Sequence, residues 1–185
     1  MAIPTPAQCL ALMDRYQMPA NIRAHSLMVG RVAGFLAAAL AAKGEAARVE
    51  VALAGAMLHD IAKGPCLHGR CRHAERGAEI CRAHGYDELA GIVAEHVVLA
   101  QGFTGSCGER EIVYYADKRV RHDQVVSLPE RRDDLVIRYG ADNPLIQEQI
   151  LQNFLICRRL EEHIFARLHP LTPADLALAV TDYQL

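Results

Sequence analysis

Residues 49–63 read VEVALAGAMLHDIAK, a segment that is apolar on almost every side of a helix until it reaches His59 and Asp60. A helix that is apolar all round is normally buried in the centre of a domain. A buried helix should not end in an adjacent imidazole and carboxylate unless both are satisfied. A metal ion that binds both side chains would satisfy them, whereas a solvated helix end is the simpler interpretation of this pair taken alone.

Helical patterns continue on both sides of this segment. Glycines and prolines separate them, and Pro144 stands at the first position of a long helix, where proline is favoured. No run of four to eight alternating residues indicates a strand, and residues 122–143 mix charges with turn signals. We therefore predict an all-α, single-domain helical bundle over residues 1–185. The expected helices cover about 5–16, 22–42, 49–61, 73–84, 87–98, 108–121 and 144–168, with a short last helix after Pro173.

The composition is that of a globular protein with an aliphatic core. Of 185 residues, 51% are hydrophobic and 23% charged, and there is no Trp. The net charge of −2 argues against a nucleic-acid-binding protein, which would usually be basic. No signal peptide is evident, and the apolar stretches fall short of the roughly 20 residues that span a bilayer. We expect a cytoplasmic protein that binds no membrane and keeps its six cysteines reduced.

Further imidazoles and a carboxylate lie at intervals along the predicted helices. His25 is near the start of the helix that precedes residues 49–61, and Asp117 ends the apolar run IVYYAD. Between them lie His73 and His96, each on a helix of its own. Nitrogen and oxygen ligands of this kind suit Fe, Mn, Co, Ni or Zn. The candidate metal ligands, in chain order, are His25, His59, Asp60, His73, His96 and Asp117.

Five short motifs give these residues a context. They are AHSLMV at 24–29, MLHDIAK at 57–63, HAERGA at 73–78, IVAEH at 92–96 and YADK at 115–118. On these motifs the chain resembles the HD-domain superfamily of metal-dependent phosphohydrolases, in its HDIG-type branch, over about residues 20–135. The resemblance implies an all-α HD domain, with residues of about 144–180 as a helical extension.

The resemblance also implies a metal centre and a reaction. His25, His59, Asp60 and Asp117 would hold one divalent metal, and His73 and His96 would hold a second that Asp60 bridges. Two metals of this kind activate a shared water and clamp a phosphoryl oxygen. The implied reaction is hydrolysis of a phosphate ester or anhydride by a metal-bound hydroxide, with Asp60 doubling as the general base.

Within this superfamily the chain is most similar to small bacterial proteins that split dinucleoside tetraphosphates symmetrically. It departs from them after His96, where Val97 and Val98 replace the usual Thr and nearby Gly. A nucleotide or a dinucleoside polyphosphate is therefore the implied substrate. Two alternatives remain open: a dinuclear-iron oxygenase of the same superfamily, and a regulatory HD domain that binds metal or nucleotide without catalysis.

A phosphate group needs positive charge beyond the metals. Lys63 follows the His-Asp pair closely and Lys118 follows Asp117 directly, so both are candidates for substrate binding, and Lys63 also for catalysis. The arginines are weaker candidates, because most arginines on helical proteins are solvated. They are Arg76, Arg121 and Arg131.

Two other segments carry competing interpretations. Cys66, His68, Cys71 and His73 are zinc-type ligands, although they come from one short loop, and His68 could also replace His73 as a ligand. Residues 122–185 could shape the substrate pocket, or they could form the interface of a homodimer through an apolar stripe on the helix expected over 144–168. The stripe consists of Ile146, Ile150, Phe154, Cys157, Ile164, Phe165 and Leu168.

Overall fold

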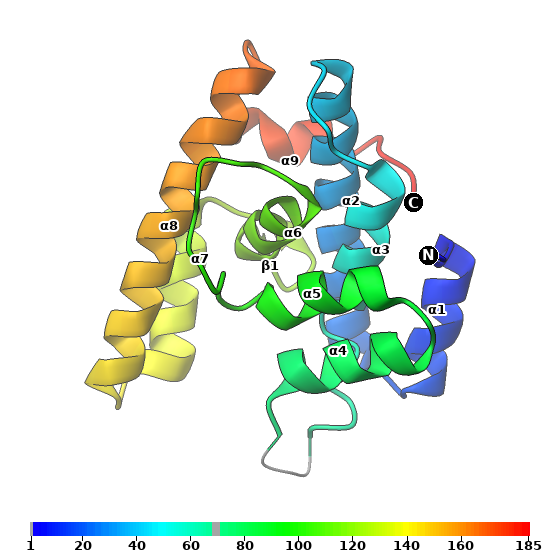
Figure 1. Ribbon diagram of the computed structural model, residues 1–185. Helices are drawn as coiled ribbons and strands as arrows, with labels where there is room; N and C mark the ends of the chain where they lie inside the picture. The colour runs from blue at the N-terminus through cyan, green and yellow to red at the C-terminus, as the bar shows by residue number, and fades with distance from the viewer. Residues whose placement is uncertain (1, 68–70) are drawn as a thin grey trace.

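The computed structural model describes residues 2–67 and 71–185 and confirms the all-α fold class (Figure 1). Within these residues the only sheet is a two-residue hairpin of β1 (Val120–Arg121) and β2 (Gln124–Val125). The helices are α1 (Pro6–Arg15), α2 (Ala20–Ala42), α3 (Val49–Leu58), α4 (His73–Ala83), α5 (Asp87–Glu95), α6 (Glu109–Lys118), α7 (Leu128–Leu135), α8 (Pro144–Leu168) and α9 (Leu176–Ala179), together with a π-helical turn η1 (Val136–Gly140) and a short 3₁₀ turn η2 (Pro173–Asp175).

Helix α3 lies in the middle of the molecule, as its apolar sequence predicts. It packs against α1, α2, α5 and α6, and α4 covers the far side of α5 (Figure 1). Gly77 permits the close approach of α4 to α5, because a Cβ atom at this position would lie 2.7 Å from Cγ1 of Val93. This crossing brings His73, at the start of α4, beside His96, directly after α5.

The segment between β1 and α8 differs from the prediction of turns over 122–143. Ser127 caps α7: its backbone N–H donates to the carboxylate of Glu130 at 2.9 Å, and its hydroxyl accepts from the N–H of Glu130. This capping box is a recognised helix start, and the charge-rich sequence that follows it concealed the helix. The β hairpin also escaped prediction, because two-residue strands are too short to show an alternating pattern.

Helix α8 begins at Pro144 and ends at Leu168, as predicted. Most of its apolar stripe is buried against the rest of the protein, and its first two members, Ile146 and Ile150, line a cavity. The stripe therefore contributes to the core and to a cavity of the molecule, and a homodimer stays a prediction. The buried members are Phe154, Cys157, Ile164, Phe165 and Leu168.

Helix α2 is, in the part of the chain that the structure describes, the one helix long and apolar enough to cross a membrane by length and composition alone. Its 23 residues exceed the apolar stretch that we counted from the sequence. However, 56% of its most apolar window is buried inside the molecule. This burial is the pattern of a core helix, which passes the same test.

Candidate metal centre

Two groups of potential ligands meet at Asp60. His25 and His59 form one group with Asp60, and His73 and His96 form the other; within each group the ligand atoms lie within 4.8 Å of one another. Oδ2 of Asp60 is 3.2 Å from Nε2 of His59. Oδ1 is 3.5 Å from Nε2 of His73 and 3.4 Å from Nε2 of His96. The two carboxylate oxygens therefore face different groups, as a bridging ligand requires.

The end of α3 explains how neighbouring residues reach the same place. We predicted that this helix continues to Ile61, but it ends at Leu58, and residues 59–62 form tight turns. In a continuous helix, adjacent side chains point about 100° apart. Because the helix stops first, the side chains of His59 and Asp60 can both be directed into the interior, where each is 0% exposed.

Backbone carbonyls orient three of the imidazoles. Nδ1 of His59 donates to the carbonyl of Ala56 at 2.6 Å, and Nδ1 of His96 donates to that of Val93 at 2.6 Å. Nδ1 of His25 donates to the carbonyl of His122, in the β hairpin, at 2.9 Å. A neutral imidazole with its proton on Nδ1 has a free lone pair on Nε2. Fixing the ring and its tautomer in this way is typical of metal-binding histidines.

Asp117 completes the first group from the end of α6. Its Oδ1 lies 3.0 Å from Nε2 of His25 and 3.7 Å from Nε2 of His59. Lys118 is buried behind it, and Nζ of Lys118 donates to Oδ2 of Asp117 at 2.8 Å and to the carbonyl of His96 at 2.7 Å. This lysine thereby connects the two ligand groups.

The donor atoms fit a divalent metal. Nε2 of His59 and both carboxylate oxygens of Asp60 are buried, and within the described chain none of them has a hydrogen-bond partner of acceptable geometry. Nζ of Lys63 lies 2.6 Å from Oδ2 of Asp60 and balances part of its charge. Burying unsatisfied polar atoms costs free energy, and a bound cation would remove that cost.

The electrostatics hold the second group in the protonation states that metals need, whereas Asp60 and Asp117 raise the pKa of His59 in the first group although its burial opposes this. Burial opposes ionisation of Asp60, yet the His59 imidazole and Lys63 hold the pKa of its carboxyl well below the usual range. Burial and the neighbouring His96 lower the pKa of His73 to about 4. Burial also lowers the pKa of His96. At neutral pH the second group therefore consists of a carboxylate and two neutral imidazoles, which are the ligand forms.

A cavity of about 500 Å³ opens beside this centre. Several of the predicted site residues line it, among them Lys63, His73, His96 and Asp117. Lys118 also lines it. The other predicted ligands, His25, His59 and Asp60, are buried and are not among the described residues that line the cavity.

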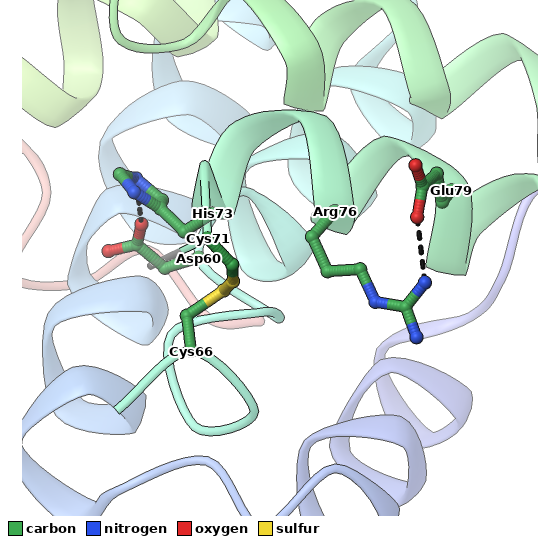
Figure 2. The surroundings of a disulfide bond; sticks show 6 residues. All are labelled: Asp60, Cys66, Cys71, His73, Arg76 and Glu79. Carbon is green, nitrogen blue, oxygen red and sulfur yellow. Dashed lines mark hydrogen bonds and ion pairs between the residues drawn. A yellow bond between two sulfur atoms is a disulfide. The ribbon is translucent and has the colours of Figure 1, made fainter. Parts of the chain in front are cut away.

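The three candidate arginines differ in their position relative to the cavity. Arg76 is paired with Glu79 on the surface of α4, and Figure 2 shows its side chain directed away from Asp60 and His73. Arg121 lies on β1 and is not among the described residues that line the cavity. Arg131, on α7, lines it.

The loop between Lys63 and His73 corrects the expectation of six reduced cysteines. Cys66 and Cys71 form a disulfide beside Asp60 and His73 (Figure 2). Sulfur atoms bonded to each other are not thiolate ligands, which leaves the alternative zinc site without its cysteines. His68, its other proposed ligand, lies outside the described residues. His73 is directed toward Asp60, in the second ligand group.

Comparison with known proteins gives one family and one relative. A family model described as the HD domain matches residues 22–125. An uncharacterized protein of Methanocaldococcus jannaschii is 32% identical over 153 residues, covering 72% of this chain and 86% of the relative. The search of solved structures found no match. All six predicted metal ligands lie within the region matched by the family model.

Proposed function

Because this chain belongs to the HD domain family, we propose that it is a metal-dependent phosphohydrolase that cleaves a phosphate ester or anhydride of a nucleotide or dinucleoside polyphosphate. The observation that carries this proposal is the position of Asp60 between two groups of histidines. Its two oxygens face different groups and lack hydrogen-bond partners of acceptable geometry in the described chain, although Lys63 forms an ion pair with Oδ2. This family generally contains metal-dependent phosphohydrolases, and the centre offers ligands for two divalent ions.

The residues of the chain have separate tasks in this proposal. His25, His59 and Asp117 hold the first ion with Asp60, and His73 and His96 hold the second. Divalent ions bound there would lower the pKa of a water molecule and polarise the phosphoryl oxygens.

Two lysines serve the same centre. Lys63 is the lysine placed to contact the phosphate, because it lines the cavity and its side chain is 34% exposed. Lys118 is 4% exposed and holds Asp117 in position.

The substrate enters through the cavity of about 500 Å³, which has the size of a small-molecule site. Its walls are mostly apolar, so a nucleotide base could lie against them while its phosphate meets the metal centre. A small phosphorylated molecule is therefore the proposed partner.

The decisive experiment compares the wild type with Asp60→Asn, which keeps the shape of the side chain and removes its charge. Both proteins are purified anaerobically, loaded with Mn²⁺ and tested on nucleoside monophosphates, diadenosine tetraphosphate and simple phosphomonoesters. We expect Asp60→Asn to lose metal and at least about 10³-fold in kcat/KM. The control is Asp133→Asn, an exposed aspartate paired with Arg132, which should retain both. A fully active Asp60→Asn protein would contradict the proposal.

The second metal has its own test. In a double variant with His73→Gln and His96→Gln, elemental analysis should find about one ion per chain where the wild type binds about two. The wild type should remain active in the absence of O₂, because hydrolysis consumes no oxidant. Equal metal content in both proteins would remove His73 and His96 from the proposed ligand set.

A further inference from the structure

The cavity beside the metal centre changes character along its length. Its inner end is formed by metal-centre residues, among them His73, His96 and Asp117. The rest is built by residues after α5 and by α7, η1 and α8, nearly all of which follow the region matched by the family model.

Each positive charge in the cavity lies beside a carboxylate, although the buried Nε of Arg131 has no hydrogen-bond partner in the described chain. Its cationic lining residues, within the described chain, are Lys63, Lys118 and Arg131. Nζ of Lys63 lies 2.6 Å from Asp60 and Nζ of Lys118 lies 2.8 Å from Asp117. Nη1 of Arg131, the one cation away from the metal centre, lies 2.7 Å from Asp134. A polyphosphate chain needs cations along its whole length, and the outer part of the cavity supplies a single, paired arginine.

Apolar side chains dominate the outer part instead. Val97 and Val98 line it from the segment after α5, and Ile146, Ile150 and Phe154 line it from α8. Val98 is 56% exposed and Ile146 is 37% exposed, so both leave apolar surface uncovered in a concave site. Covering this surface with an apolar part of a ligand would be favourable, at about 25 cal/mol for each Å² removed from water.

The polar groups of the outer cavity add little charge. Asn153 donates from its side-chain amide to the carbonyl of Val97 at 2.8 Å and accepts from the hydroxyl of Tyr114 at 2.5 Å. Gln149 and Tyr139 are exposed and offer an amide and a hydroxyl group. The outer cavity therefore offers apolar contact and neutral hydrogen-bonding groups to whatever extends from the metal centre.

Resting on the phosphohydrolase function proposed above, we propose that the substrate is an organic monophosphate whose alcohol carries a largely apolar body, in preference to a dinucleoside polyphosphate. The single phosphoryl group lies at the metal centre, and the apolar body lies between Val98 and Ile146. Hydrolysis forms a bond from the oxygen of water to phosphorus and breaks the bond from phosphorus to the ester oxygen. The products are inorganic phosphate and the free alcohol, which takes a proton originating from the water.

Two substrates with the same kind of leaving group isolate this preference. Ethyl phosphate and 2-phenylethyl phosphate both release a primary alcohol, so the chemistry at phosphorus is matched and only the apolar body differs. With the Mn²⁺-loaded wild type, we expect kcat/KM to be at least about ten-fold higher for 2-phenylethyl phosphate, mainly through a lower KM. Diadenosine tetraphosphate should be the poorest of the three.

Neighbouring residues on α8 provide matched variants. Ile146→Ser should lower kcat/KM for 2-phenylethyl phosphate about five-fold or more and leave ethyl phosphate within about two-fold. Leu145→Ser is the control, because Leu145 is 76% exposed and is not among the lining residues, so the preference should be unchanged. Val98→Ser tests the lining segment after α5 and should act like Ile146→Ser.

The outcomes separate the two proposals. If no phosphate ester or anhydride is hydrolysed by the metal-loaded protein, the proposed function itself fails. If hydrolysis occurs but both alkyl phosphates react equally, or diadenosine tetraphosphate is preferred, the phosphohydrolase stands and the inference about the substrate is overturned. An equal effect of Ile146→Ser and Leu145→Ser on the preference would also overturn it.

Discussion

Nε2 of His25 lies 3.0 Å from Oδ1 of Asp117, although the two residues are ninety-two positions apart in the chain. A second hydrogen bond fixes the position of each side chain. The ring of His25 donates to the backbone carbonyl of His122 at 2.9 Å, and Lys118 donates to the other oxygen of Asp117 at 2.8 Å. The pair thus joins α2 to the end of α6 at the first ligand group.

This contact predicts the effect of Asp117→Asn. The substitution preserves size but removes the charge that attracts a cation, so we expect the affinity for Mn²⁺ to fall at least about 100-fold. Isothermal titration of the metal-free protein with Mn²⁺ measures it. Asp123→Asn, on the exposed turn of the hairpin, is the control and should bind as the wild type does. Unchanged affinity in Asp117→Asn would exclude this residue as a ligand.

Local patterns predicted the elements that depend on local chemistry. The start of α8 at Pro144 follows from proline's preference for the first helical turn, and the burial of α3 follows from its apolar sequence. The exact arrangement after Leu58 could not be predicted, because the chain leaves its helix there to direct His59 and Asp60 inward. That break depends on the tertiary environment and has no local signal.

The candidate metal ligands could be predicted because their residue types are typical of metal binding. The candidate ligands are histidines and aspartates, which few other roles bring together. The carbonyl of His122 that orients His25 could not be predicted, because every residue has a backbone carbonyl. The contrast between Arg76 and Arg131 is similar: an arginine is usually solvated, and only the packing of α7 places Arg131 at the cavity.

Arg119, directly after α6, is a buried cation that connects α6 to α8 and to the segments around Val126 and Pro173. It is 4% exposed and donates to the carbonyls of Val126 and Pro173 and to the carboxylate of Glu161 at 2.7, 2.9 and 2.9 Å. Arg119→Gln leaves these acceptors without their donors, so we expect it to lower the free energy of unfolding by about 3 kcal/mol or more. Urea denaturation followed by circular dichroism measures the loss.

The control for this variant is Arg158→Gln. Arg158 and Glu162 are 69% and 70% exposed and 3.8 Å apart, so their pair should contribute less than about 1 kcal/mol. Arg119→Gln and Arg158→Gln unfolding at the same urea concentration would show that the buried contacts of Arg119 add no stability.

The disulfide between Cys66 and Cys71 predicts a labelling pattern. In protein unfolded without reductant, an alkylating reagent should modify the four free cysteines, Cys9, Cys81, Cys107 and Cys157; after reduction it should modify all six. Mass spectrometry of a digest identifies the modified positions. Modification of Cys66 and Cys71 without reductant, in protein kept from added thiols during purification, would show that they are reduced.

Cys157 predicts how stability changes at alkaline pH. It is fully buried, and burial raises the pKa of its thiol from 9.0 to about 12. Between these values the folded protein keeps a proton on Cys157 that the unfolded chain has lost. The contribution of the buried thiol to the free energy of unfolding is therefore complete below pH 9.0 and is lost as the pH rises toward about 12. The loss is about 1.4 kcal/mol per pH unit.

The free energy of unfolding of Cys157→Ala should therefore decline less steeply over this range, as measured by urea denaturation at a series of pH values. Leu160→Ala, which opens the same buried face of α8 but removes no titratable group, should lower stability without changing the slope. Parallel curves for the wild type and Cys157→Ala would contradict the assignment.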